Sequence, residues 1–351
     1  MSQKSQESGK KVLVGMSGGV DSSVTACLLK EMGYEVIGIH LRFWTDPTVF
    51  SDEEQIKFPQ NKCCTLEGLA KTRRVAQKIG IPFYVLNFEE SFKTEVVDYF
   101  IEGYRNGITP NPCIECNRSV KFGLFLEKMR ELGADYVATG HYARKVTVTE
   151  PDSSERYELW TAKDAQKDQS YFLYTLTQEK LRHILFPIGE YSKTEVRKLA
   201  EKFGIGEINE QKESQNLCFF PEATHGPFLK RHLAGDSFEH GPIITTEGQT
   251  IGEHMGLPNY TIGQRKGLGI GGMKGEGEGL PWYVVSIDRS RNALIVGKDK
   301  DLQKQVLEAH TLSFVAEKLP EGRKEIRAKI RSRFPMQPAT LSVETDASEP
   351  K

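Results

Sequence analysis

The chain has 351 residues, of which 38% are apolar and 27% charged, as in proteins that bury a sizeable core in water. Its 47 Lys and Arg balance 48 Asp and Glu, which excludes a uniformly basic nucleic-acid binder but not a local basic patch. No apolar run reaches the ~18 residues of a membrane span. Residues 1–10 lack the apolar stretch of an export signal. We therefore expect a disordered leader at 1–10 and a cytoplasmic protein without membrane partners.

Strand-like and helix-like segments alternate through the N-terminal two-thirds. The pattern predicts strands at 11–16, 35–43, 83–88 and 135–139, and helices at 22–32, 66–79, 91–104 and 120–132. A hairpin is expected from 145–149 and 157–161, and a helix follows from Ser192 to Phe203 with Ser192 and Glu195 as its capping box. This order predicts an α/β fold with a doubly wound parallel sheet, whose ligands bind beyond the carboxyl ends of the strands.

After about residue 220 the sequence becomes rich in glycine, proline and β-branched residues. Hairpins are expected at 243–251 and 282–296, separated by a glycine-rich tract at 263–279. At about 150 residues per domain the length suggests two or three domains. We therefore expect an α/β domain at 11–221, a small connecting domain at 222–283, and a β-rich, barrel-like domain at 284–351.

A phosphate-binding loop follows the first strand. The run GMSGGVDSS at 15–23 opens the next helix, where backbone N–H groups, hydroxyls and the helix dipole attract an anion. It lacks the lysine of a Walker loop. A glycine-rich turn without a ligand is the competing interpretation, but the serines and the aspartate argue against it. The predicted ligand residues are Gly15, Met16, Ser17, Gly18, Gly19, Val20, Asp21 and Ser22.

This loop resembles the S-G-G-x-D-S loop of the PP-loop ATP pyrophosphatases, which cleave ATP between the α and β phosphates to adenylate a carbonyl oxygen. The resemblance implies ATP and Mg²⁺ as cofactors, with Asp21 near the magnesium-bound pyrophosphate. It also places Leu41 at the adenine and Gly140 against the nucleotide. Without the resemblance, Leu41 fits a core position and Gly140 a turn.

The six cysteines are too few for a disulfide scaffold, so we expect reduced thiols. Cys27 fits the core of the first helix, and the pair at 63 and 64 fits a capping or packing role. Cys113 and Cys116 fall in a proline-bounded loop before a helix with basic residues, a setting that lowers a thiol pKa. This C-x-x-C also fits a redox pair or half a zinc site, although no second pair completes one. Cys218, within Leu-Cys-Phe-Phe, reads locally as a buried apolar residue.

The blocks GMSGGVDSSV, TPNPCIECNRSVKF, LGADYVATGHYA, KDQSYFLYTL, SQNLCF, YTIGQRKGLGIGG and PWYVV occur in order along nearly the whole chain. Together they resemble the tRNA-specific 2-thiouridylase family. The resemblance implies ATP-dependent thiolation at C2 of the wobble uridine in tRNAs for Gln, Lys and Glu. It implies that Cys218 carries a persulfide received from a sulfur donor, either a cysteine desulfurase or a relay protein. Cys116 then attacks the persulfide, and a transient Cys116–Cys218 disulfide remains.

One position departs from the family pattern. Many members read N-P-D-x-x-C, whereas this chain reads Asn111-Pro112-Cys113, so the carboxylate proposed there as an acid or base is missing. Three cysteines then surround one site, and related thiolases bind a [4Fe–4S] cluster with three cysteines. A cluster held by Cys113, Cys116 and Cys218 is therefore an alternative to the persulfide route, which remains our first hypothesis.

The resemblance also implies contacts with tRNA. Asn111, Pro112 and Cys113 match the loop that holds the flipped target base, and a second set matches other tRNA contacts: His141, Lys167, Asp168, Gln169, Arg331 and Ser332. For His141 a general base is the alternative. Residues 318–333 carry a net charge of +5, which suits phosphate contacts or a solvated strand face.

The chain ends at Lys351, whereas family members usually continue past the region of 336–343 with two or three more strands. We therefore expect a short last domain and a weaker, more salt-sensitive affinity for tRNA. Two other functions compete with tRNA thiolation. A PP-loop ligase or amidotransferase acting on a small molecule does not need Cys116 or Cys218. A catalytically inactive protein that binds tRNA or a sulfur carrier does not need the intact phosphate loop.

Overall fold

The structure is a computed structural model. It describes residues 9–49, 66–210, 217–222, 224–233, 238–270, 280–316, 320 and 322–343. Cys63, Cys64, most of the predicted leader and the end of the chain lie outside these residues.

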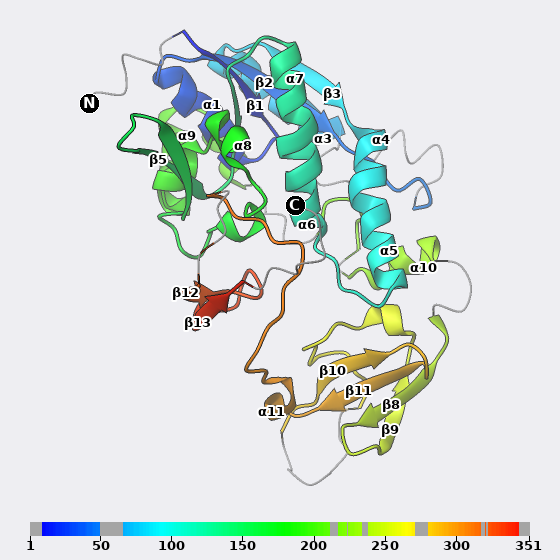
Figure 1. The fold of residues 1–351 in the computed structure, drawn as a ribbon. Helices are drawn as coiled ribbons and strands as arrows, with labels where there is room; N and C mark the ends of the chain where they lie inside the picture. The colour runs from blue at the N-terminus through cyan, green and yellow to red at the C-terminus, as the bar shows by residue number, and fades with distance from the viewer. Residues whose placement is uncertain are drawn as a thin grey trace.

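A five-stranded parallel sheet forms the centre of the first domain, in the order β3-β2-β1-β4-β7 (Figure 1). Its strands are β1 (Lys11–Gly15), β2 (Glu35–Arg42), β3 (Phe83–Asn87), β4 (Tyr136–Thr139) and β7 (Ile184–Leu185). Every neighbouring pair is parallel. Four of the strands lie where the sequence pattern places them, and the short β7 was not expected.

Helices cover both faces of this sheet. Residues on β1 alternate between two cores, with Val12 and Val14 in one and Leu13 in the other. The first core includes α1 (Val20–Glu31), α3 (Leu66–Ile79) and α9 (Lys193–Lys202). The second core includes α4 (Glu89–Phe92), η1 (Lys93–Asp98) and α5 (Tyr99–Arg105). It also includes η2 (Cys116–Leu124) and α7 (Phe125–Glu131), which continue the helix that begins as α6 (Pro112–Glu115). The predicted doubly wound α/β fold is thus confirmed.

The helix expected at 120–132 begins earlier, at Pro112. Proline is tolerated at the first helical position because the N–H it lacks has no intrahelical partner there. The preceding Asn111 acts as the N-cap and accepts a hydrogen bond from the Ile114 N–H at 3.4 Å. Cys113 and Cys116 therefore lie in the first turns of a helix, and their prediction as loop residues was wrong.

The rest of the first domain consists of a separate two-stranded hairpin and several short helices. The expected hairpin is present as β5 (Ala143–Thr149) and β6 (Glu155–Thr161). Short elements follow as η3 (Ser170–Phe172), α8 (Gln178–Arg182), η4 (Pro187–Glu190) and η5 (Gly206–Glu210). The capping box of α9 is confirmed, since Ser192 and Glu195 bind each other's backbone N–H groups.

A second sheet, shown in yellow and orange in Figure 1, has the strand order β10-β11-β8-β9. It consists of β8 (Gly241–Thr245), β9 (Thr250–His254), β10 (Tyr283–Asp288) and β11 (Ala293–Gly297), with α10 (Gly226–His232), η7 (Leu257–Asn259) and α11 (Asp299–Leu302) nearby. Both expected hairpins are present. The boundary placed at 283/284 falls inside this sheet, because β11 pairs with β8 and both sides share one apolar core.

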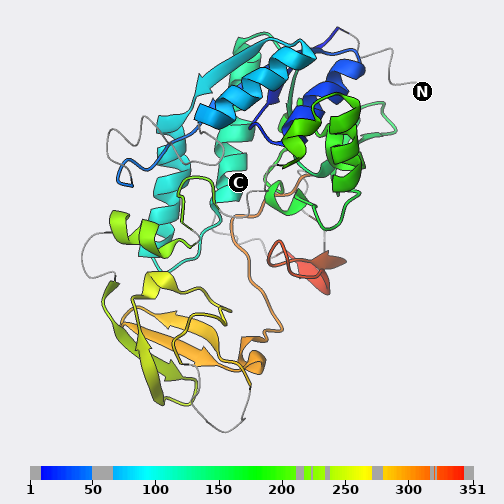
Figure 2. The same cartoon turned by 180° about the vertical axis from the view of Figure 1, so that it is seen from behind.

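The last described segment returns to the first domain (Figure 2). It ends in the hairpin of β12 (Arg323–Ala328) and β13 (Gln337–Ser342). The Tyr171 hydroxyl donates to the Ile330 carbonyl at 3.1 Å, and the Gln178 amide donates to the Val315 carbonyl at 2.6 Å. Within the described ranges, no helix combines the length and apolarity needed to cross a membrane.

Candidate active site

A cavity of about 760 Å³ opens at the carboxyl ends of β1, β2 and β4. This is where ligands bind in open parallel sheets. The cavity brings together most of the residues that the sequence singled out, from six separate stretches of chain: Gly15, Met16, Ser17, Gly19, Asp21, Ser22, Leu41, Asn111, Pro112, Cys113, Cys116, Gly140, His141, Gln169 and Cys218.

The conformation of the phosphate loop is fixed by hydrogen bonds of Ser22 and by the close approach of Gly140. Ser22 Oγ accepts from the Ser17 N–H at 3.2 Å and donates to the Gly19 carbonyl at 3.1 Å. Gly18 has a φ of +82°, a conformation that favours glycine. At Gly140, a Cβ atom would lie 2.7 Å from the Ser22 nitrogen, so only glycine lets β4 approach the loop this closely. Gly18 and Val20 shape the loop without lining the cavity.

Asp21 is held by two side chains that sequence reasoning missed. Lys193 Nζ lies 2.8 Å from both carboxylate oxygens, and the Tyr142 hydroxyl donates to Asp21 Oδ1 at 2.8 Å. The Lys193 side chain is only 11% exposed and comes from the first turn of α9, far from the loop in sequence. Although the loop lacks a lysine of its own, the fold therefore places a cation beside it.

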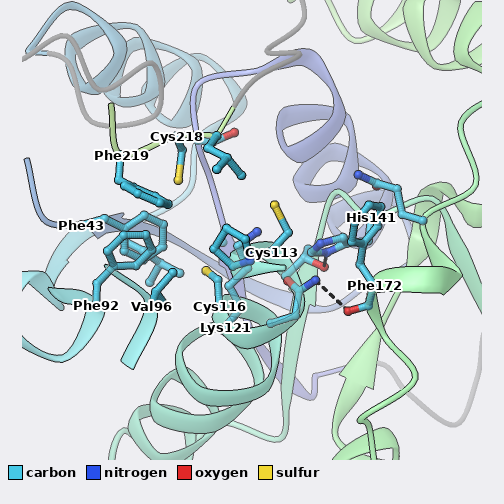
Figure 3. A pocket seen from close by; sticks show the side chains of 18 of the residues that line it. Phe43, Phe92, Val96, Cys113, Cys116, Lys121, His141, Phe172, Cys218 and Phe219 are labelled. Carbon is cyan, nitrogen blue, oxygen red and sulfur yellow. Dashed lines mark hydrogen bonds between the residues drawn. The ribbon is translucent and has the colours of Figure 1, made fainter. Parts of the chain in front are cut away.

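The cysteines reach the cavity from two sides (Figure 3). Cys113 and Cys116 lie on α6 and η2, and Cys218 lies on the segment across the cavity. Cys113 is exposed, Cys116 is buried and Cys218 is half-buried. None of the cysteines that the structure describes is in a disulfide. The η2 segment has π-helical pairing, which is common at functional sites, and it directs both Cys116 and Lys121 to the cavity.

The structure does not group the three cysteines as ligands of a metal ion. Among the described residues, no group of three His, Cys, Asp or Glu side chains lies close enough together to hold a metal ion. Cys113, Cys116 and Cys218 all belong to the residues searched. The [4Fe–4S] alternative therefore stays a prediction from the sequence, in which the same three cysteines would hold the cluster.

Aromatic packing positions Cys218. The neighbouring Phe219 and Phe220 are buried and pack on rings from α4, α5 and α10. The segment is also held through Glu222, which pairs with Arg231, and Arg231 in turn binds the buried Asp46 at 3.0 Å. The sequence Leu-Cys-Phe-Phe is therefore partly a core sequence, yet Cys218 itself faces the cavity (Figure 3).

His141 forms a buried wall of the cavity. Burial, with a smaller contribution from Lys121, holds the pKa of His141 well below its usual range. Its Nδ1 lies 2.7 Å from the Thr139 hydroxyl oxygen. The imidazole is therefore neutral at pH 7, so it can exchange hydrogen bonds with a ligand but does not supply a positive charge.

The remaining residues predicted to contact tRNA form two groups. One group donates to or accepts from the backbone near the cavity, and the other lies on a separate surface beyond β12. Gln169 Oε1 accepts from the Tyr142 N–H at 2.9 Å, and Asp168 Oδ1 accepts from the Ala162 N–H at 2.9 Å. Lys167 is half-buried beside them and, like Asp168, does not line the cavity. Arg331 and Ser332 lie beyond β12, where Arg331 Nη2 donates to the Ile262 carbonyl at 2.6 Å.

Comparison with known proteins agrees with this architecture. A family model described as the tRNA methyl transferase HUP domain matches residues 10–222, and the corresponding PRC-barrel domain model matches residues 226–298. A protein of Moorella thermoacetica named tRNA-specific 2-thiouridylase MnmA is 47% identical over 93% of this chain and 87% of its own length. The chain belongs to this family. Its Clostridioides difficile relative of the same name is 44% identical over 95% of the chain and 87% of its own length.

The resemblance drawn from the sequence blocks is thereby confirmed. Solved structures are more remote. A complex titled 4-thiouridine synthetase with RNA and bound ATP is 18% identical, with a TM-score of 0.39, over 60% of this chain and 45% of that one. A predicted tRNA methyltransferase subunit from Methanocaldococcus jannaschii has a TM-score of 0.32 at 18% identity, over 55% of this chain and 74% of that one. Likenesses this distant assign no function.

Proposed function

We propose that this protein is an ATP-dependent tRNA sulfurtransferase that converts the wobble uridine of tRNAs for Gln, Lys and Glu to 2-thiouridine. One observation carries the proposal: the cavity joins a phosphate loop, two cysteines from opposite sides and a helix-capping Asn111-Pro112 segment. Family membership over nearly the whole chain supports the reaction type.

The first half of the proposed reaction uses the phosphate loop. The uracil O2 attacks the α-phosphorus of ATP, pyrophosphate leaves, and the N3 proton passes to water. The backbone N–H groups and hydroxyls of the loop bind phosphate oxygens. Asp21 is the carboxylate at this loop and is the residue we expect to hold the magnesium ion, which neutralises phosphate charge when bound. Lys193 and Tyr142 keep that carboxylate in one orientation.

The second half uses the two thiols. A donor, either a cysteine desulfurase or a relay protein, leaves a persulfide on Cys218. The Cys116 thiolate attacks the Cys218 sulfur of the persulfide, forming the Cys116–Cys218 disulfide and releasing HS⁻. The sulfide attacks C2, AMP leaves with the oxygen, and the proton carried by sulfide restores N3–H. An external thiol then reduces the disulfide.

Incubation with ATP, Mg²⁺, a persulfide donor and tRNA tests the proposal, with nucleoside mass spectrometry as the measurement. We expect 2-thiouridine with the wild type, and none with Cys116→Ala or Cys218→Ala although both still bind ATP. Cys27→Ala is the matched control and should retain activity. Thiolation that persists without Cys116 or Cys218 would overturn the assigned roles.

A further inference from the structure

A buried hydrogen-bond acceptor in the cavity wall lacks a partner. Asn117 follows Cys116 on η2 and is 3% exposed. Its Nδ2 donates to the Phe172 carbonyl at 3.0 Å, a bond drawn in Figure 3. Because a carbonyl can only accept, this bond fixes the amide orientation and makes the other atom the oxygen. That Oδ1 atom is buried and has no hydrogen-bond partner in the structure.

An arrangement of this kind predicts a ligand with a donor. A buried acceptor without a hydrogen bond costs about 1–3 kcal/mol, so such atoms are rare unless something else satisfies them. Asn117 lines the cavity next to Cys116, and its hydrogen bond to Phe172 uses Nδ2 and leaves Oδ1 unsatisfied. The cavity occupant should therefore present an N–H or O–H group to Asn117.

The neighbouring side chains indicate which molecule supplies that donor. Phe172, whose carbonyl holds Asn117, also lines the cavity, and an aromatic ring is a surface on which an extruded base can stack. The phosphate loop that would bind ATP lies at the strand ends, whereas Asn117 belongs to the helix that carries Cys113 and Cys116. A base whose C2 is to react near these thiols has N3 as the adjoining ring atom.

We propose that Asn117 selects uracil by accepting its N3–H through Oδ1. The inference rests on the proposed function and adds a specificity residue to it. Uracil carries a donor at N3, whereas cytosine carries an acceptor there, which would face the Asn117 oxygen as one lone pair against another. The contact belongs to the complex before adenylation, when N3 still has its proton. Asn117 thus acts in recognition of the base and not in the bond-making steps.

Binding in the absence of ATP isolates this step. Fluorescence anisotropy would measure the affinity of the wild type and Asn117→Leu for anticodon stem-loops with uridine, cytidine or 3-methyluridine at the target position. We expect the wild type to prefer uridine to the other two by about tenfold, as for one well-placed base hydrogen bond. Asn117→Leu should bind all three alike. A preference that is equal in both proteins would overturn the proposal.

Two controls separate base recognition from structural effects. Asn117→Asp keeps an acceptor but loses the donor to Phe172, so it should retain the preference for uridine. Loss of the preference in both Asn117→Asp and Asn117→Leu would mean that bracing Phe172 is the only role, and would overturn the proposal. ATP affinity should stay unchanged in Asn117→Leu. A loss of ATP affinity with an intact uridine preference would assign the oxygen to adenine instead.

The same proteins distinguish this inference from the proposed function. If the wild type forms no 2-thiouridine in the complete assay, the proposed function fails. If the wild type thiolates tRNA but Asn117→Leu discriminates between uridine and cytidine as the wild type does, only the role of Asn117 fails. Retained persulfide formation on Cys218 would show that the variant is folded.

Discussion

Lys193 supports the phosphate loop through the Asp21 carboxylate, a role that the sequence did not reveal. Replacing it with Met leaves the Asp21 carboxylate without its cation. We expect a loss of about 1–3 kcal/mol in the free energy of unfolding, below the ~3–5 kcal/mol of a fully buried pair because Asp21 is 31% exposed. Urea denaturation of Lys193→Met measures it, and thiolation activity should fall as well.

A double variant separates stability from function at this pair. Asp21→Asn combined with Lys193→Met removes both charges, so stability should recover toward the wild type. Activity should not recover, because the carboxylate proposed to hold magnesium is gone. Lys202 on the same helix pairs with Glu31, and its side chain is 59% exposed. Lys202→Met should therefore change neither the stability nor the activity. Full activity in the double variant would contradict the role given to Asp21.

The buried imidazole of His141 makes stability depend on pH. Burial first, and Lys121 second, hold its pKa well below 6.5 in the folded state. As the pH falls below 6.5 the unfolded chain takes up a proton that the folded chain does not, so stability decreases. The slope can reach about 1.4 kcal/mol per pH unit. Urea denaturation between about pH 5 and 7 should give a shallower dependence of stability on pH for His141→Gln than for the wild type.

Thiol reactivity should follow burial. Cys113 is exposed, whereas Cys27 is buried and its pKa is raised to about 11, chiefly by desolvation. At pH 7.5 the Cys27 thiolate is then roughly 1 in 3,000 of the total. Iodoacetamide labelling followed by peptide mass spectrometry should modify Cys113 well before Cys27. After denaturation the two cysteines should be labelled equally. Equal labelling in the native protein would contradict the placement of Cys27 in the core.

At the scale of elements, the approach of β4 to the phosphate loop depends on one glycine. In Gly140→Ala the new Cβ would lie 2.7 Å from the Ser22 nitrogen and 2.9 Å from the Asp21 carbonyl carbon, so the loop must move. We expect ATP affinity to fall by roughly tenfold or more, since backbone donors must sit within ~3 Å of the phosphate. Equilibrium binding of ATP measures this. Gly15 lines the same cavity, and a Cβ atom there would lie at ordinary distances of 3.5–3.8 Å from its neighbours. The Gly15→Ala variant should therefore bind ATP nearly as the wild type does.

Local patterns predicted the first domain well because periodicity, caps and turn residues act over a few residues. The strands around the loop and the capping box of α9 are examples. The start of α6 was missed because two prolines mask a helix whose cap is Asn111. Lys193, Tyr142 and Asn117 were missed for another reason, since their roles come from partners far along the chain. Cys218 needed the family resemblance, because its neighbours are core residues.

On the scale of the whole molecule, the chain crosses between its parts more than once. After the second sheet, the segment carrying β12 and β13 returns to the first domain, where Ile330 accepts a hydrogen bond from Tyr171. Arg331 beside it binds the Ile262 carbonyl near the second sheet. The basic hairpin is thus tied to both parts of the molecule. The site proposed to hold the base and the surface proposed to meet tRNA phosphates are therefore linked through these contacts.

This arrangement makes the salt dependence of tRNA binding a test of the hairpin. Arg323 and Arg327 are exposed and lie four residues apart on one face of β12, with Glu325 between them on that face. If each contacts a phosphate, the double variant Arg323→Ala with Arg327→Ala should reduce the slope of log affinity against log salt by about 1.4–1.8, measured by filter binding between about 50 and 200 mM salt. Lys202→Ala on α9 removes a charge of the same sign elsewhere and should leave the slope unchanged. An unchanged slope in the double variant would mean that β12 does not face the phosphates, since releasing fewer counterions is the direct consequence of losing such contacts.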